Sequence, residues 1–321
     1  MTVETKDQVI VKKATRDAFG EAILQLAREN KQIVALSANL AESTRLDGLI
    51  KELPDQYFEV GVAEQNMAGI AAGLALSGKI PFITSFAAFS PGRNWEQIRV
   101  AICYNNANVK IVSTHAGLSV GADGATHQAL EDIAITRAIP DLVILSPADY
   151  YEAKKAVIAA AEYKGPVYIR LSRQPSPFIT DESTRFEIGK CNILKEGKDL
   201  TIVAMGLMVN EAMLAADKLE KEGISAEVIN CHTIKPLDKQ TIISSVKKTG
   251  RAITAEEHQI IGGLGSAVSE ILSENYPVPI KRIGIHDCFG ESGSAGELLS
   301  KYGCNCDNIV EAAKTLISNT K

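Results

Sequence analysis

One carboxylate stands where a strand-like run gives way to a helix-like run. The stretch Val60-Gly-Val-Ala-Glu-Gln-Asn places Glu64 at this junction, and a run rich in Ala and Gly continues to residue 76. An acidic residue at a helix start is common, because it complements the helix dipole and the free backbone N–H groups. The small residues that follow predict a helix that packs very closely against its neighbours. Glu64 is therefore either an ordinary helix-start acid or a carboxylate that serves a bound ligand.

A glycine-rich segment over residues 114–128 contains three further polar candidates. It follows a strand-like run and carries His115, Asp123 and His127. Open α/β sheets bind ligands outside the carboxyl ends of their strands. The three side chains are also of metal-ligand types, but a loop with so many glycines is poorly suited to a preset metal cage. We expect these residues to contact a polar ligand, and we expect no metal site on this chain.

Two phenylalanines, Phe86 and Phe89, follow another strand-like run. Their spacing fits a place in the hydrophobic core. It fits equally a surface on which a flat ring stacks. The two residues alone do not decide between these interpretations.

Taken together, these segments resemble the thiamine-diphosphate enzymes of the transketolase group. The resemblance rests on Gly61-Val-Ala-Glu-Gln-Asn with its Ala/Gly-rich helix, and on the glycine-rich segment 114–128. In that family the glutamate hydrogen-bonds N1′ of the cofactor's aminopyrimidine ring, so that the cofactor acts as its own general base. The resemblance thus implies that Glu64 activates thiamine diphosphate and that Phe86 and Phe89 stack on its pyrimidine.

The sequence departs from the family pattern at two places near the cofactor. Asn39 stands where the family commonly has Asp, and it keeps the hydrogen-bonding shape without the charge. Residues 90–93, Ser-Pro-Gly-Arg, stand where single-chain transketolases have a third aromatic residue. We therefore expect the family fold with a pyrimidine pocket that differs in detail.

The resemblance also implies a channel for a sugar phosphate. In this channel His115 would contact the phosphate, Asp123 the C2 hydroxyl group, and His127 the nearby hydroxyl groups. Both histidines would assist proton transfers.

Three more residues match phosphate-binding positions of the family, namely Arg16, Ser43 and Arg173. Together with His115 they would form a multidentate phosphate clamp, since charge-assisted hydrogen bonds favour such groupings.

The motif that holds the cofactor's diphosphate through a divalent metal is missing. The family motif is Gly-Asp-Gly, whereas the only Gly-Asp or Asp-Gly pairs here lie at residues 47–48 and 123–124, without the correct neighbours. The resemblance covers essentially the whole chain, but only the second and third domains of a single-chain transketolase. It implies that a separate N-terminal subunit holds the diphosphate with Mg²⁺ or Ca²⁺, in an α2β2 assembly.

Short apolar runs alternate with amphipathic runs, which predicts strands separated by helices. The predicted strands cover residues 33–37, 58–62, 81–86, 109–114, 142–145, 167–171, 200–204, 226–229, 252–255 and 280–284. The predicted helices cover residues 17–30, 65–76, 148–163, 209–222, 238–248 and 265–274. This alternation indicates right-handed crossovers and mainly parallel sheets.

The polar stretch 172–199 interrupts the alternation and is typical of a linker. The fold class is therefore α/β, with two α/β domains. By the resemblance, residues 1–175 form a pyrimidine-binding domain, 176–190 a linker and 191–321 a transketolase C-terminal domain.

A second glycine-rich turn spans residues 256–266. It could cradle a phosphate at a helix start, but it lacks the Gly-x-Gly-x-x-Gly spacing of dinucleotide sites. The resemblance gives this region a mainly structural role in subunit association.

The composition is that of a soluble globular protein, with 45% hydrophobic and 23% charged residues. A net charge of -5 disfavours a nucleic-acid partner. Residues 1–7 lack a signal-peptide pattern, and no apolar run is long enough to cross a membrane. The six scattered cysteines, with Cys304 and Cys306 as a close pair, indicate reduced thiols in the cytoplasm rather than a disulfide framework or a metal site.

These observations predict a transketolase subunit that transfers a two-carbon ketol unit from a ketose phosphate to an aldose phosphate. A β subunit of a 2-oxo acid dehydrogenase has a similar length and glutamate segment, but no need of a phosphate clamp. A 1-deoxyxylulose-5-phosphate synthase shares the Glu-Gln motif within a single chain that includes the diphosphate domain. A non-catalytic homologue stays open, although Glu64 and both histidines argue against it.

Overall fold

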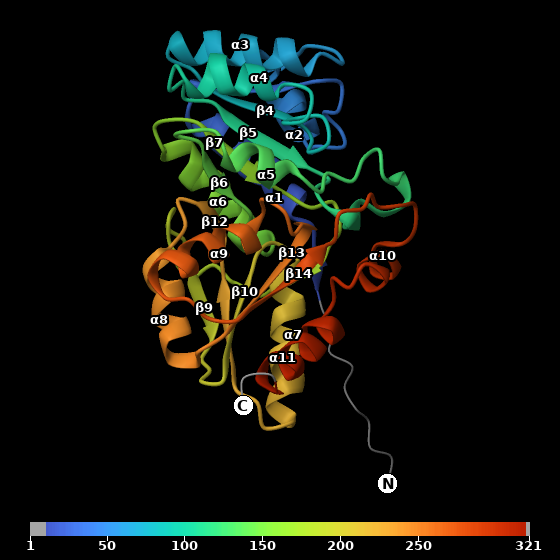
Figure 1. Ribbon diagram of the computed structural model, residues 1–321. Coiled ribbons are helices and arrows are strands. Elements are labelled where there is room, and N and C mark those ends of the chain that lie inside the picture. Colours follow the sequence, from blue (N-terminus) through green and yellow to red (C-terminus); the bar gives the residue numbers. More distant parts are fainter. Residues whose placement is uncertain (1–10, 319–321) are drawn as a thin grey trace.

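The computed structural model of the chain describes residues 11–318, which fold around two β-sheets covered by helices (Figure 1). In this described part, one sheet has the strand order β12-β6-β7-β5-β4-β2-β3 and the other β14-β13-β10-β11-β9. Neighbouring strands are parallel except at β12 and β9, and a short antiparallel pair joins β1 to β8. The predicted α/β class with mainly parallel sheets is confirmed. Residues 1–7, where no signal peptide is expected, lie outside the described residues.

The strands of the first sheet are nearly all buried, as expected for parallel strands with helices on both faces. They are β2 (Ile33–Ser37), β3 (Tyr57–Glu59), β4 (Ile80–Phe86), β5 (Lys110–Thr114), β6 (Val143–Leu145), β7 (Val167–Arg170) and β12 (Thr233–Lys235).

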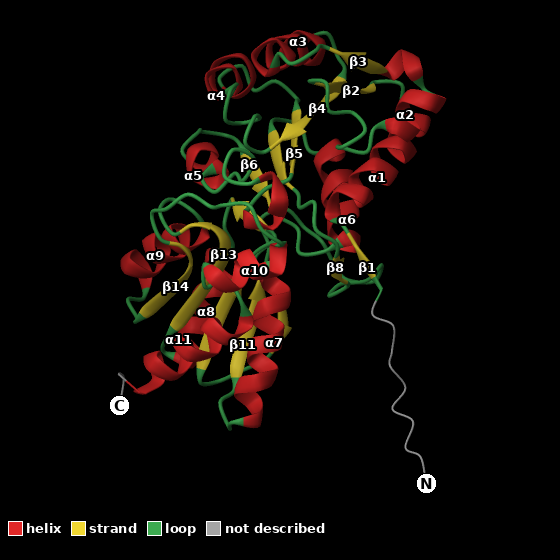
Figure 2. Ribbon diagram, turned by 90° about the vertical axis from the view of Figure 1, so that its right-hand side faces the viewer, coloured by secondary structure: helices red, strands yellow, loops and turns green. Residues whose placement is uncertain are grey.

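Successive residues of these strands pack into different layers of core. Ala35, Phe82 and Val112 pack beneath α1 (Thr15–Glu29) and α6 (Tyr150–Glu162). The residues beside them in sequence pack beneath α3 (Glu64–Leu76) on the opposite face. Figure 2 shows α1 and α6 side by side along one flank of this sheet. Smaller helices surround it, namely α2 (Asp47–Glu52), α4 (Trp95–Gln97) and α5 (Asp132–Arg137).

Helices also cover both faces of the second sheet. Its strands are β9 (Asn192–Lys195), β10 (Leu200–Ala204), β11 (Ala226–Asn230), β13 (Ala252–Gln259) and β14 (Ile280–Ile285). Helices α7 (Met208–Lys221) and α11 (Cys306–Ser318) share one core layer, and α8 (Lys239–Thr249) and α9 (Leu264–Asn275) share the other. Helix α10 (Ala295–Lys301) lies beside a 3-10 turn at Leu118–Asp123 next to the first sheet (Figure 1), and its Leu298 joins the core layer of α7 and α11.

The first half of the chain, from β1 to β8, and the second half, from β9 onward, are joined by β12. This strand belongs to the second half of the chain, yet it pairs antiparallel with β6 of the first sheet, with Thr233 opposite Leu145. The ammonium group of Lys235 donates hydrogen bonds to the carbonyls of Arg137, at 3.1 Å, and Ile139. One hydrophobic core runs continuously from Val34 of the first sheet to Val203 of the second. The halves therefore share a core as well as a surface.

All ten predicted strands and six predicted helices are present, with ends shifted by a few residues. The linker interpretation of residues 172–199 is wrong in part, because β9 lies inside it as an edge strand paired with β11. Its residues are only partly buried, so its sequence gives no strong strand pattern. The domain limits at 1–175, 176–190 and 191–321 stay a prediction. Across residues 11–318 no helix is long and apolar enough to cross a membrane.

Candidate active site

Glu64 is the first residue of α3 and is only 3% exposed. The chain turns sharply before it at Gly61, whose φ of +68° is favourable for glycine. Arg93 Nη1 lies 3.1 and 3.2 Å from the two carboxylate oxygens. Among the described residues Arg93 supplies the only hydrogen bonds to this carboxylate, so the side chain does not cap its own helix. A buried acid held by a single arginine is free to exchange that partner for a ligand.

An open cleft lies directly in front of this carboxylate. Its volume is about 570 Å³, and it is lined by Val62, Ala63, Glu64, Gln65, Asn66 and Arg93. Arg93 is half-exposed, and its guanidinium group stands 4.1 Å from the centre of the Phe89 ring. Such a cation–π contact is modest at an exposed site. The arginine is thus held by two weak attachments at the mouth of the cleft.

Phe86 and Phe89 form an aromatic surface together with the two histidines, and Phe89 also contacts Arg93 of the cleft. Their rings stack with centroids 5.8 Å apart. Phe86 also stacks on His115 at 3.7 Å, and Phe89 meets His127 edge-on at 5.3 Å. Four flat rings therefore lie together beside the buried carboxylate, an arrangement suited to a flat heteroaromatic ligand.

His115 lies at the carboxyl end of β5 with a φ of +58°, a conformation that non-glycine residues rarely adopt. Its Nε2 is 3.2 Å from Arg16 Nη1, and its Nδ1 is 2.8 Å from Thr114 Oγ1. Because a guanidinium group only donates, Nε2 must accept and the proton belongs on Nδ1. Burial, followed by the charge of Arg16, lowers the pKa of His115 to about 3. The ring is therefore neutral at physiological pH.

A cation cluster, which we define as Arg16, Arg45 and Arg173, surrounds this neutral histidine. Arg45 Nε is paired with Asp17 at 2.7 Å, and Arg173 with Asp123 at 3.2 Å.

Within residues 11–318 Arg16 has no carboxylate partner, and its buried Nε has no hydrogen-bond partner at all. Its Nη1 donates to the backbone carbonyl of Ser43 at 3.0 Å. Burial, with the nearby charge of Arg45, lowers the pKa of Arg16. An unpaired cation with an unsatisfied donor is the feature expected where an anion binds.

The remaining predicted residues are placed around the same edge. Asp123 accepts both its hydrogen bonds from Arg173, so its carboxylate is already oriented. The His127 Nδ1 lies 2.8 Å from Thr126 Oγ1. Asn39 is exposed just after β2 with a φ of +61°, and its backbone N–H donates to Glu59 Oε1 at 2.8 Å. The carboxyl ends of the adjacent strands β2, β4 and β5 bring these segments together.

Sequence reasoning missed three residues that shape this region. Arg45 joins the cation cluster, Arg93 holds Glu64, and Glu59 binds the backbone N–H groups of Asn39 and Gly61 at 2.8 Å each. Arg93 stands in the segment 90–93 that departs from the family pattern, and this departure was the signal available. Nothing in the sequence distinguishes Glu59 or Arg45 from surface charges.

No three His, Cys, Asp or Glu side chains within the described part of the chain gather at a metal-binding spacing. Nor do the residues of the cleft provide a second set of cations for a diphosphate. The residues present fit the aminopyrimidine end of thiamine diphosphate, through a buried carboxylate and an aromatic surface.

The comparisons with known proteins agree with this geometry. The family model described as transketolase, pyrimidine binding domain matches residues 11–177, and that described as transketolase, C-terminal domain matches residues 189–309. A Methanocaldococcus jannaschii protein named as a transketolase C-terminal section is 48% identical over 304 residues, or 94% of this chain and 95% of that protein. A 6-deoxy-6-sulfo-D-fructose transketolase subunit from Clostridium sp. is 44% identical over 298 residues, or 93% of this chain and 92% of that protein.

Solved structures give the same result. A split-gene transketolase, described as an inactive beta4 tetramer, superposes with a TM-score of 0.89 at 47% identity. The match covers 95% of this chain and 98% of that chain. The chain therefore belongs to the transketolase family, and it carries the pyrimidine-binding and C-terminal domains of a split transketolase.

Proposed function

We propose that this chain is the C-terminal subunit of a two-subunit transketolase that transfers a two-carbon ketol group from a ketose phosphate to an aldose phosphate. The observation that carries the proposal is the buried Glu64 carboxylate at the mouth of an open cleft, with only Arg93 as its partner. Such a carboxylate fits the ring nitrogen N1′ of thiamine diphosphate. The cofactor, when bound, supplies the nucleophilic carbon that attacks the ketose.

The other site residues have roles that follow from their contacts. Phe86 and Phe89 would hold the pyrimidine ring, with Asn39 nearby. Glu64 would exchange Arg93 for N1′ and hold the proton there. His115 and His127 would assist proton transfers at substrate hydroxyl groups. Burial and Arg16 lower the pKa of His115 to about 3, so this ring would stay neutral and act through hydrogen bonds. Asp123, fixed by Arg173, would orient the C2 hydroxyl group.

The cation cluster supports a substrate with an anionic end. Arg16, lacking a carboxylate partner among the described residues, would bind the phosphate together with His115, Arg173 and the segment at Ser43. A sulfonate would satisfy the same cations, and one relative is named for a sulfo-sugar. Comparing donor KM for xylulose 5-phosphate and 6-deoxy-6-sulfofructose would identify the preferred anion. Arg16→Ala should raise the KM of the preferred donor by about tenfold to a hundredfold, in line with the loss of one to two charge-assisted hydrogen bonds.

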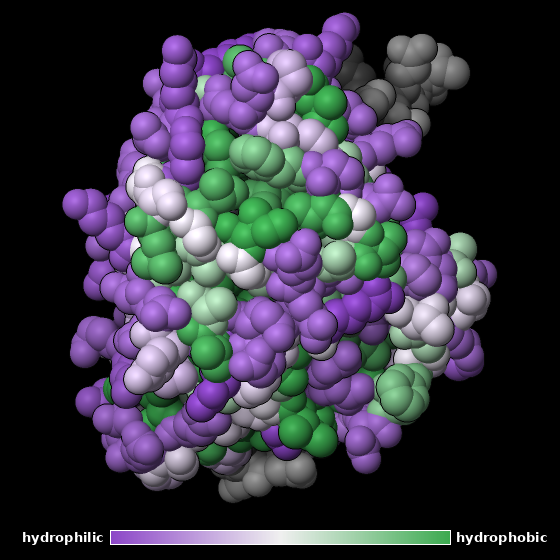
Figure 3. All heavy atoms as spheres, turned by 90° about the horizontal axis from the view of Figure 1, so that it is seen from above, coloured by the Kyte–Doolittle hydropathy of each residue, from purple (hydrophilic) through white to green (hydrophobic). Residues whose placement is uncertain are grey.

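A separate N-terminal subunit would hold the diphosphate and its Mg²⁺ or Ca²⁺. Two relatives bear names of sections or subunits, and the related tetramer of one chain type is described as inactive. An apolar patch lies on the face above α3 (Figure 3), and its exposed apolar residues include Val62, Ile70, Leu76 and Val100. Contiguous apolar surface favours association, so we propose that this face is covered in an α2β2 assembly.

The test is reconstitution of the activity. The purified chain is mixed with the N-terminal subunit, thiamine diphosphate and Mg²⁺, and two-carbon transfer from xylulose 5-phosphate to ribose 5-phosphate is measured. We expect activity only in the complete mixture, and we expect Glu64→Ala to abolish it. Activity of this chain with cofactor alone would overturn the two-subunit proposal. Equal rates for the wild type and Glu64→Ala would overturn the catalytic one.

A further inference from the structure

Near its carboxyl end, strand β13 carries three consecutive buried polar residues, Glu256, Glu257 and His258. Their side chains have different partners. The Glu256 carboxylate accepts the backbone N–H groups of Leu264, at 2.6 Å, and Gly265, at 2.8 Å, and so caps α9 within its own half. Glu257 and His258 instead contact the first half. The glycine-rich turn 256–266 of the sequence thus belongs to the contact between the two halves.

Glu257 is 3% exposed and binds the glycine-rich segment that carries the candidate substrate residues. Its Oε1 accepts the backbone N–H of Ser119, and its Oε2 lies 3.2 Å from the Ser119 hydroxyl oxygen. A Cβ atom at Gly117 would lie 2.4 Å from the Glu257 carboxyl carbon, so only glycine permits this approach. Ser119 lies in the first of two short turns within Leu118–Asp123, which meet at a kink at Gly121 (φ +82°), and Asp123 ends the second. The position of Asp123 therefore depends on where Glu257 holds Ser119.

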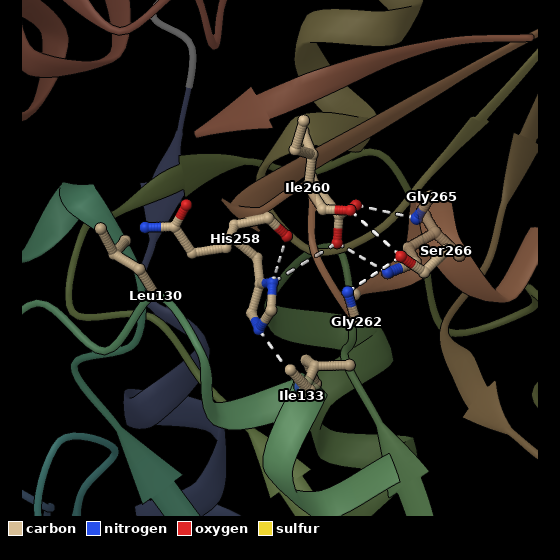
Figure 4. Close-up of polar contacts among 12 residues, drawn as sticks. Leu130, Ile133, His258, Ile260, Gly262, Gly265 and Ser266 are labelled. Atoms are coloured by element: carbon tan, nitrogen blue, oxygen red, sulfur yellow. Dashed lines mark hydrogen bonds and ion pairs between the residues drawn. The ribbon is translucent and has the colours of Figure 1, made fainter. Parts of the chain in front are cut away.

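The far side of the same segment is also attached to the second half. The N–H of Gln259 donates to the carbonyl of Leu130 at 2.7 Å, and Gln128 Nε2 donates to the carbonyl of Glu291 at 2.9 Å. His258 Nε2 accepts the N–H of Ala134 at 3.3 Å, at the start of α5. Figure 4 shows His258 between Leu130 and Ile133 of the first half and the turn at Gly262–Ser266 of the second. The residues from Asp123 to His127 therefore lie between two sites that are hydrogen-bonded to the second half, Ser119 on one side and Gln128 on the other.

A buried ion pair lies behind Glu257. Arg170 Nε is 2.9 Å from Asp132 Oδ2, and Arg170 Nη2 donates to the Glu257 carbonyl at 2.9 Å. Burial raises the pKa of Glu257 to about 7, with Arg170 opposing the rise. Glu257 is thus buried beside a charged pair, and its two carboxyl oxygens are satisfied by the two donors of Ser119.

We propose that Glu257 of the C-terminal domain is a positioning residue for the substrate segment, holding Ser119 so that Asp123 and His127 face the sugar. The proposal rests on the proposed function, because it presumes that this segment contacts substrate. Glu257 itself touches no reacting atom. The C-terminal domain then has a role in catalysis in addition to its role in packing.

The experiment compares Glu257→Ala and Glu257→Gln with Glu256→Gln in the reconstituted two-subunit enzyme. Glu256 is the matched control, because it is the adjacent buried carboxylate and has no hydrogen bond to the segment 117–127 among the described residues. We expect Glu257→Ala to raise the donor KM by about tenfold or more, from the loss of both acceptors, with a smaller change in kcat. Glu257→Gln keeps one carbonyl acceptor for the Ser119 N–H and should recover most of the loss. Glu256→Gln should leave the KM within about twofold of wild type.

A second readout does not depend on activity. Hydrogen exchange of the purified chain should be at least tenfold faster over residues 117–127 in Glu257→Ala, and unchanged there in Glu256→Gln. Unchanged exchange in Glu257→Ala, or an equal rise in KM for both positions, would overturn the positioning role. If the wild type transfers no ketol group, the proposed function fails, while the exchange result still decides whether Glu257 holds the segment. Should Glu257→Ala not fold, Ser119→Ala decides, because it removes the hydroxyl contact with Glu257. Exchange over residues 117–127 that stays at the wild-type rate in Ser119→Ala would then overturn the positioning role.

Discussion

Two glutamates, Glu64 and Glu257, are equally buried at 3% exposure, yet their surroundings differ completely. Glu64 faces an open cleft and is held by one half-exposed arginine, Arg93. Glu257 lies between the two halves and is satisfied by the backbone and hydroxyl group of Ser119. Burial alone therefore does not identify a reactive carboxylate. What distinguishes them is whether the partner can be exchanged for a ligand without breaking the fold.

The same contrast holds for the arginines beside them. Arg93 is half-exposed at the mouth of the cleft, and Arg16 lacks a carboxylate partner among residues 11–318. Arg170 is buried against Asp132, which is itself fully buried and also accepts from Tyr168 at 2.8 Å. The ligand-facing region keeps unsatisfied or weakly satisfied charges, whereas the interdomain region satisfies its charges within the chain. The four predictions below test this division.

The largest effect should come from the same substitution made at each glutamate. Glu64→Gln removes the acid from the cofactor ring, so kcat should fall by roughly 10²- to 10⁴-fold, the usual contribution of a proton-transfer group. Glu257→Gln keeps an acceptor for the Ser119 N–H, so its kcat should stay near the wild-type value and its KM should rise only slightly. Steady-state kinetics of the reconstituted enzyme measure both constants. A similar loss of kcat at both positions would contradict the conclusion that Glu64 is reactive and Glu257 only positions the substrate segment.

The second prediction concerns stability. Arg170→Met leaves the buried Asp132 carboxylate without its ion partner, and such a loss costs about 3–5 kcal/mol of unfolding free energy. Urea unfolding followed by circular dichroism measures this change. The double variant Arg170→Met/Asp132→Leu should recover part of it, since no uncompensated charge remains. If the single variant is as stable as wild type, the buried Arg170–Asp132 pair does not stabilise the fold next to the contact between the two halves.

The third prediction concerns acid sensitivity in the ligand-facing region. The pKa of His115 is lowered to about 3 by burial and then by Arg16, whereas an unfolded imidazole titrates near 6.5. Between these values the unfolded state binds more protons, so the stability is lost as pH falls below about 6.5. The free energy of unfolding should therefore fall between pH 8 and pH 5.5, and the fall should be about 1 kcal/mol smaller in His115→Gln than in the wild type. Urea unfolding at the two pH values gives the difference, and identical losses would contradict a buried neutral histidine.

The smallest effect should come from Arg93. Arg93 is half-exposed, and the Glu64 carboxylate, although buried, opens onto the cleft, where water can replace the arginine. Arg93→Met should therefore change the unfolding free energy by less than about 1 kcal/mol, unlike the loss of Arg170 from the enclosed Asp132. Arg93→Lys, which keeps the charge, is the control. A loss of several kcal/mol in the free chain would mean that Arg93 is a structural partner of Glu64 rather than an exchangeable one.

Much of this fold could be predicted from local patterns. The strands at residues 33–37, 110–114 and 200–204 are short apolar runs between amphipathic segments, and such periodicity is a local property. Strand β12 could not be predicted this way, because it leaves its own sheet to join the other half, and only tertiary pairing decides that. Strand β9 was not predicted for a related reason. An edge strand is only half-buried, so its sequence needs no apolar pattern.

The sequence by itself determined the residue types of the site, because Glu64, the two histidines and the phenylalanines stand in recognisable segments. It also determined that apolar strands end just before them. Only the tertiary structure decided which charges are paired: that Arg93 holds Glu64, that Arg45 joins Arg16 and Arg173, and that Glu257 anchors Ser119. Charge pairing depends on distances between segments far apart in the chain, and no local pattern encodes those distances.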